Sequence, residues 1–95
     1  MRDSILIENF LEMMSAERGA AANTIEAYRR DLEETSDFLS SAKQSLIEAD
    51  SNTIRMVIED LSKRGFAASS QARHLSSLRQ FYQFLYAEGY RTDDP

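Results

Sequence analysis

The side chains best suited to chemistry in this chain are cations, amides and hydroxyls that recur at helical spacing between Ser69 and Leu85. That spacing predicts a helix whose outward side carries polar groups and no carboxylate. The predicted outward side comprises Ser70, Arg73, His74, Ser77 and Gln80. The wider stretch from Leu61 to Ala87 also contains no Asp or Glu, although the rest of the chain is rich in both. A cationic, hydrogen-bonding helix face of this kind predicts contact with an anion, and nucleic acid is the obvious candidate.

The opposite side of the same predicted helix is apolar and is expected to face the core. It comprises Ala72, Leu75, Leu78, Tyr82, Leu85 and Tyr86. Arg79 lies at the edge of this apolar stripe, and two roles for it stay open. In one, its stem packs on the bundle and its guanidinium forms a structural ion pair; in the other, it contacts DNA. Gln71 is a further, weaker candidate for a DNA contact on this segment.

A second group of candidates lies between Asn23 and Leu32. Asn23 and Thr24 lie where the free backbone amides of a helix start can receive a phosphate. Arg29 and Arg30 would then hold the DNA backbone, but Arg30 shares its side of the helix with acidic residues and can equally pair with them.

Other chemistries lack the residues they require. The single histidine cannot build a zinc site in a chain without cysteine, and the three glycines are isolated rather than grouped in a phosphate loop. The carboxylates are expected on solvated helix faces, and the serines lack a histidine–acid partner pair. The sequence therefore predicts no catalysis by this chain alone, no metal and no cofactor.

Composition indicates one globular domain. The chain has 95 residues, of which 42% are hydrophobic and 28% charged, and its net charge is −5. The negative charge counts against nucleic-acid binding, but thirteen of the sixteen acids and six of the eleven bases precede residue 61. Binding to DNA is thus expected to be weak and salt-sensitive. Without cysteines, a signal-peptide pattern or a long apolar run, the expected location is the cytoplasm, with no membrane contact.

The elements expected to position these residues are four helices in a compact all-α bundle. The first should be capped by Asp3 or Ser4 and run to about Arg18, before Gly19. A capping box of Asn23 and Glu26 should start the second, and Asp50 should cap the third, which Gly65 closes. Residues 41–49 are expected to be a polar connection, and the fourth helix should run from about Ser69 to Gly89.

Two segments resemble a known family when taken together. The segments Asn23-Thr24-Ile25-Glu26-Ala27-Tyr28-Arg29-Arg30-Asp31-Leu32 and Ser70-Gln71-Ala72-Arg73-His74-Leu75-Ser76-Ser77-Leu78-Arg79-Gln80-Phe81-Tyr82-Gln83-Phe84-Leu85 are similar to the N-terminal core-binding, SAM-like domain of tyrosine site-specific recombinases, most closely the Xer type. The tail from Leu85 to Pro95 resembles the stretch that leads into the catalytic domain of such proteins. The resemblance divides the chain into a core-binding domain, residues 1–90, and the start of a linker, residues 91–95.

The resemblance implies a domain that forms half of a C-shaped clamp around duplex DNA, with its second and fourth helices near the major groove. The catalytic residues and nucleophilic tyrosine would belong to a separate C-terminal domain. The complete enzyme would cut and rejoin DNA through a phosphotyrosyl intermediate and resolve chromosome dimers. Its partners would be a recombination site and other subunits in a tetrameric synapse, including a second Xer-type recombinase. This sequence departs from the family pattern at Ala21, where a serine is common, which weakens a helix cap or phosphate donor. It also departs at His74 and Ser77, so the base preference of this face stays open.

Two other interpretations remain open at this stage. One is an acidic helical protein-interaction module with no DNA role, in which the fourth helix docks an acidic partner. The other is a free-standing helical regulator that binds DNA as a dimer.

Overall fold

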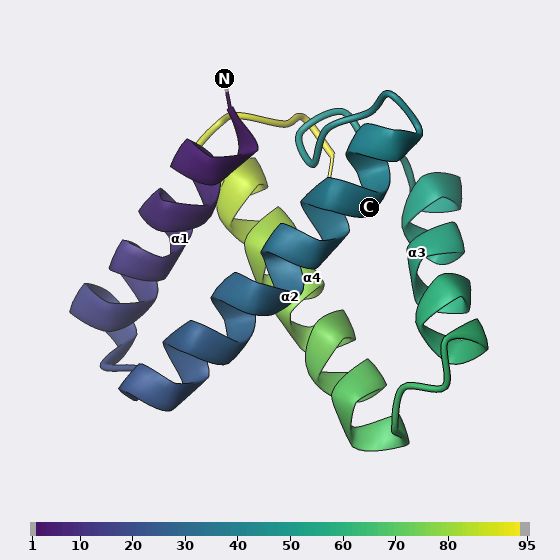
Figure 1. Cartoon of the computed structure of the whole chain (residues 1–95). Helices are drawn as coiled ribbons and strands as arrows, with labels where there is room; N and C mark the ends of the chain where they lie inside the picture. Colours follow the sequence, from purple (N-terminus) through teal and green to yellow (C-terminus); the bar gives the residue numbers. More distant parts are fainter. Residues whose placement is uncertain (1, 94–95) are drawn as a thin grey trace.

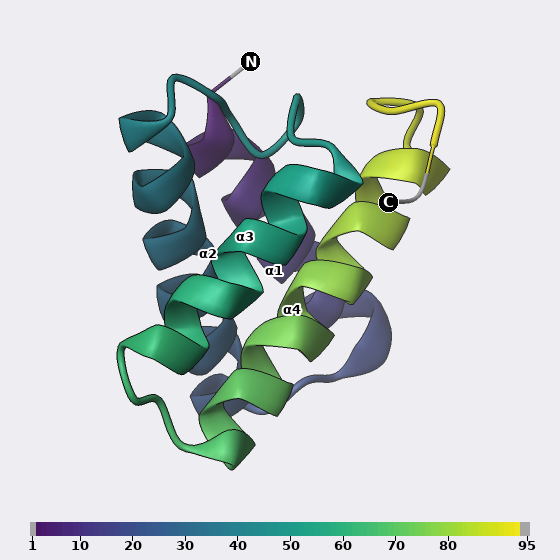
Figure 2. The same cartoon turned by 90° about the vertical axis from the view of Figure 1, so that its right-hand side faces the viewer.

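Four helices make up the fold in the computed structural model, which describes residues 2–93 (Figure 1). They are α1 (Asp3–Arg18), α2 (Ala22–Ser41), α3 (Ser51–Lys63) and α4 (Ala68–Ala87). The described part of the chain contains no strand, so the predicted all-α four-helix class is confirmed. In Figure 1, α2 and α4 cross between α1 on one side and α3 on the other; Figure 2 shows α3 beside α4.

The helix ends follow local signals in some places and tertiary contacts in others. As predicted, α1 ends at Gly19, which adopts the left-handed conformation at φ 62°, and Asp50 caps α3 by accepting from the Thr53 amide at 2.8 Å. The predicted cap of α1 at Asp3 or Ser4 is wrong. The Asp3 carboxylate instead accepts hydrogen bonds from the Leu46 amide and the Ser36 hydroxyl.

The predicted capping box at the start of α2 is also wrong. Asn23 already lies inside the helix, and the N-cap residue is Ala21, which supplies no side-chain hydrogen bond. The first amides of α2 are consequently not satisfied by a capping side chain.

The core lies where α1, α2 and α4 meet. Phe10 of α1 packs edge-to-face on Phe81 with 5.5 Å between ring centroids, and it also contacts Phe84. Leu32 of α2 and Leu85 of α4 are fully buried in the same cluster. Burial of this apolar surface is the main force that holds the helices together.

The connection between α2 and α3 is more ordered than a polar loop. Leu46 and Ala49 are fully buried, and the Tyr82 hydroxyl donates to the Leu46 carbonyl at 2.7 Å. Arg91 fixes the same loop by donating to the Ile47 carbonyl at 3.0 Å and the Ala49 carbonyl at 2.6 Å. The expectation of a merely polar connection at residues 41–49 is therefore wrong, because this loop contributes side chains to the core.

Arg91 and Asp93, which sequence analysis placed in a linker, form an ion pair at 3.0 Å. Asp94 and Pro95, the end of that predicted linker, lie outside the described residues. Within residues 2–93, no helix is both long enough and apolar enough to cross a lipid bilayer.

Candidate nucleic-acid interface

Helix α4 is the centre of the candidate interface, and its sides have different neighbours. One side packs on α1 and α2, and another faces α3. Only a narrow outer side remains in solvent, where Ala72, Arg79, Gln83 and Tyr86 are exposed. Ala72 and Tyr86 were expected in the core. That expectation is wrong, since Phe81 and Phe84 occupy the buried positions instead.

The predicted outward placement of His74 and Ser77 is wrong as well. The His74 side chain is 1% exposed, and Ser77 is completely buried where its hydroxyl donates to the His74 carbonyl. Both lie on the side of α4 that meets the rest of the bundle, so neither offers a side chain to a ligand on the outer surface. Serine suits this position because a small side chain lets helices approach closely.

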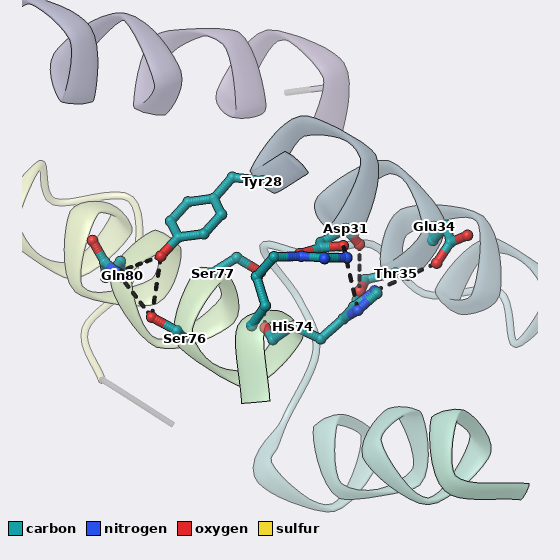
Figure 3. A network of polar contacts seen from close by, with 9 residues as sticks. Tyr28, Asp31, Glu34, Thr35, His74, Ser76, Ser77 and Gln80 are labelled. Carbon is teal, nitrogen blue, oxygen red and sulfur yellow. Dashed lines mark hydrogen bonds and ion pairs between the residues drawn. The ribbon is translucent and has the colours of Figure 1, made fainter. Parts of the chain in front are cut away.

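A buried carboxylate joins α2 to α4 at the crossing (Figure 3). Asp31 is 1% exposed and accepts two hydrogen bonds from the Arg73 guanidinium, at 2.8 and 2.9 Å. The paired carboxylate raises the pKa of Arg73, chiefly through these hydrogen bonds. Arg73 was predicted to face outward as a DNA contact; over a third of its side chain is exposed, but its charge is already matched.

His74 completes this cluster from α4. Its ring nitrogens lie 3.3 Å from the Asp31 carboxylate and 3.4 Å from that of Glu34, although neither contact has hydrogen-bond geometry. The ring also packs edge-to-face on Phe66, with 5.8 Å between centroids. His74 therefore serves the packing of α4 against α2.

A second polar network lies along the same two helices (Figure 3). The Tyr28 hydroxyl is 3.2 Å from the Ser76 hydroxyl, and the Gln80 amide donates to both, at 3.1 and 3.0 Å. Arg18, at the end of α1, donates to the Gln80 carbonyl oxygen at 3.0 Å. Tyr28 is partly buried, and Gln80 is held by three neighbours.

The two neighbouring arginines of α2 have different environments. Arg29 donates two 2.9 Å hydrogen bonds to Glu8 of α1 and also pairs with Glu26, so these carboxylates raise its pKa well above the usual range. The same hydrogen bonds lower the pKa of Glu8. Arg30 is exposed and forms no ion pair with any residue that the structure describes. Of the two, only Arg30 presents an unmatched charge to solvent.

The remaining predicted residues lie in three places. Asn23 is exposed and Thr24 is half-buried in the first turn of α2. Ser70 is half-buried near the start of α4. The Gln71 side chain donates at 2.8 Å to the Phe66 carbonyl, in the turn that precedes α4. Arg79 lines the groove between α3 and α4 rather than the α2 side. Among the described residues, Arg73, His74 and Gln80 of α4 contact α2, whereas Asn23, Thr24 and Arg30 form no hydrogen bond or ion pair with α4.

Sequence reasoning missed the buried Asp31 and the supporting role of Arg18. A signal for Asp31 was present, because it falls three residues after Tyr28 and four before Thr35, on the inner stripe of α2. An acid on an apolar stripe requires a cationic partner in the core, and Arg73 provides it. Arg18 gave no such signal, since its contact with Gln80 spans 62 residues of sequence.

Among residues 2–93, no three His, Asp or Glu side chains are arranged to hold a metal ion. The interface offers hydrogen-bond donors and cations: arginine guanidinium groups, amides and hydroxyls placed along α2 and α4. Such groups suit contacts to phosphates and base edges.

Comparison with known proteins points to one family. The profile described as "Phage integrase, N-terminal SAM-like domain" matches residues 7–89. The chain is 59% identical over all 95 of its residues to the tyrosine recombinase XerD of Brucella abortus biovar 1 (strain 9-941), and the aligned region covers 31% of that relative. It is 61% identical over 89 residues to that of Rhizobium meliloti (strain 1021), covering 94% of this chain and 29% of the relative. With the XerD of Caulobacter vibrioides, the identity is 50% over 90% of this chain and 28% of the relative.

No solved structure gives a significant match. The chain spans about three-tenths of the length of the curated recombinases it matches. Its match to the family profile extends from α1 to the turn after α4, which includes both polar networks described above. The chain therefore belongs to the phage integrase family, as an N-terminal SAM-like domain.

Proposed function

We propose that this chain is the DNA core-binding domain of a XerD-like tyrosine recombinase and that it places α2 and α4 against duplex DNA at a recombination site. The observation that carries the proposal is the polar surface along α2 and α4, in a chain similar to XerD recombinases over its whole length. No carboxylate occurs on α4, and the one that α2 buries against it is neutralised by Arg73. The α4 part of this surface is thus compatible with a polyanion despite the net charge of −5, whereas α2 also carries the exposed Glu33 and the partly exposed Glu34.

Within this surface we assign direct contacts to the accessible side chains. Phosphate contacts would come from the first turn of α2 and from Arg30, and groove contacts from the rim of α4. The residues proposed for contact are Asn23, Thr24, Arg30, Ser70, Arg73, Arg79 and Gln80. His74 and Ser77 are proposed to act by positioning α4, since both are buried. Arg29 is proposed to hold α2 to α1 through Glu8, and Gln71 to hold the turn before α4 through the Phe66 carbonyl. Arg73 and Gln80 are bonded within the chain too, but neither is buried, so both are retained as contacts.

For the complete protein we propose the reaction of a tyrosine recombinase. A C-terminal domain would supply the nucleophilic tyrosine and the residues that cut and rejoin DNA through a phosphotyrosyl intermediate. Four subunits, including a second Xer-type recombinase, would assemble on the DNA in the cytoplasm and resolve chromosome dimers. This chain would supply position and part of the site recognition.

The test is fluorescence anisotropy of the chain with a labelled duplex carrying a Xer recombination site and with a scrambled duplex of equal length. Titrations from about 50 to 200 mM salt should show site preference and an affinity that falls steeply as salt rises. An affinity that does not change with salt concentration contradicts the proposal. So does the absence of binding by both this chain and the full-length recombinase. In that event a protein-interaction module is the better interpretation.

A further inference from the structure

An apolar groove lies between α3 and α4, away from the α2 networks. Its volume is about 460 Å³, and α3 and α4 run side by side along it (Figure 2). Half-buried Ile54, Ile58 and Leu75, with the buried Leu78, line it, and Arg55 and Arg79 approach it from opposite helices. The groove therefore combines an apolar surface with a cation on each side.

The two arginines of this groove lack the partners that most other arginines of the fold possess. Arg55 and Arg79 are exposed, and neither forms an ion pair within residues 2–93. By contrast, Arg64 pairs with Asp60 one helical turn away. Two unpaired cations beside one groove both attract an anion that binds between them.

We infer that this groove receives one sugar–phosphate strand of duplex DNA, with Arg55 and Arg79 donating to its phosphates. This inference rests on the proposed function and extends the interface from α2 and α4 onto α3. Arg79 links the two regions because it belongs both to the outer side of α4 and to the groove. The apolar side chains suit the faces of deoxyribose rings, while the guanidinium groups suit phosphate oxygens.

Glu59 is the one carboxylate that lines the same groove. It lies one helical turn after Arg55 on α3 but forms no ion pair with it in the described structure. A phosphate strand in the groove would be repelled by this carboxylate. Removing the charge at Glu59 should therefore strengthen DNA binding.

The experiment compares Arg55→Gln, Arg79→Gln and Glu59→Gln with the unchanged chain, using the duplex titration described above. Lys43→Gln is the matched control, because Lys43 is exposed and does not line the groove. Each arginine variant should flatten the slope of log affinity against log salt by about 0.9, the value for one lost phosphate contact. Glu59→Gln should raise affinity about two- to threefold at low salt, and circular dichroism should show an unchanged helix content in all variants.

Three results overturn the inference in distinguishable ways. If the unchanged chain binds DNA and the Arg55 variant matches the Lys43 control, the groove is not a DNA site, while the proposed function stands. If neither the chain nor the full-length protein binds any duplex, both proposals fail together. If a labelled amphipathic peptide rich in glutamate binds in an Arg55-dependent manner while duplex binding does not depend on Arg55, the occupant is an acidic protein segment instead.

Discussion

The Arg73 guanidinium on α4 holds the buried Asp31 carboxylate on α2 through two hydrogen bonds of 2.8 and 2.9 Å. Asp31 is almost fully buried, whereas Arg73 retains contact with solvent. One residue thus neutralises an acid in the core and still presents its edge to solvent, where the proposed DNA contact would form. This double role separates the effects expected from substitutions at the two positions.

Arg73→Ala should lower the free energy of unfolding by about 2–3 kcal/mol, because it leaves Asp31 buried without a cation. The value lies below that for a fully buried pair since part of Arg73 is exposed. Chemical denaturation measures the loss. The double variant Arg73→Ala/Asp31→Asn should regain much of the stability, as it removes both charges, yet still bind DNA more weakly than the unchanged chain. Equal loss in the single and double variants would contradict this account.

His74→Leu should change the free energy of unfolding by about 1 kcal/mol or less, because a side chain of similar volume replaces a ring without aligned hydrogen bonds. His74→Ala should cost about 2–4 kcal/mol through the cavity it leaves. The DNA affinity of the leucine variant should equal that of the unchanged chain. A several-fold loss of affinity at unchanged stability would restore His74 as a DNA contact.

Arg29 and Arg30 form a matched pair of adjacent arginines with opposite expectations. Arg30→Gln should flatten the salt dependence of DNA binding by about one phosphate contact, a slope of roughly 0.9, and leave the melting temperature unchanged. Arg29→Gln should keep the slope and lower stability slightly, because its hydrogen bonds join α2 to Glu8 of α1. Anisotropy and thermal melting of both variants decide the question; identical slopes would remove Arg30 from the interface.

Arg91→Ala should release the loop between α2 and α3. The side chain is 8% exposed and donates to carbonyls of Ile47 and Ala49, which would lose their partner. We expect a loss of about 2–3 kcal/mol and faster amide hydrogen exchange across residues 42–50, measured by mass spectrometry. Arg91→Lys keeps the charge but not the planar set of donors, so its stability and exchange rate should lie between those of the unchanged chain and of Arg91→Ala. Unchanged exchange in the alanine variant would show that the loop holds itself in place.

Asp50 should make stability depend on pH in the acidic range. Hydrogen bonds from Thr53, from its backbone amide first, lower the pKa of Asp50 in the folded chain. A depressed pKa means that the carboxylate stabilises the fold above its unfolded pKa of about 3.9 and that this contribution is lost as the pH falls through the folded value. Melting temperatures of the unchanged chain and Asp50→Ala should therefore differ at neutral pH and converge below about pH 3. A difference that persists at the lowest pH would show that ionisation of Asp50 is not involved.

Local sequence determined the helices themselves. The apolar periodicity, the glycine after α1 and the Asp50 cap act over a few residues, so their effects could be predicted without knowing the fold. The absence of acids from Leu61 to Ala87, together with the two family-like segments, indicated a nucleic-acid-binding role. These features depend only on neighbours along the chain.

The tertiary structure decided which side of α4 faces outward and which polar groups are already paired. Helix periodicity fixes the angle between side chains but not the direction from which other helices approach. Because several helices pack on α4, His74 and Ser77 became buried, while Ala72 and Tyr86 became exposed. Contacts such as Asp31 with Arg73, 42 residues apart, exist only once α2 and α4 cross, and periodicity alone does not determine that crossing.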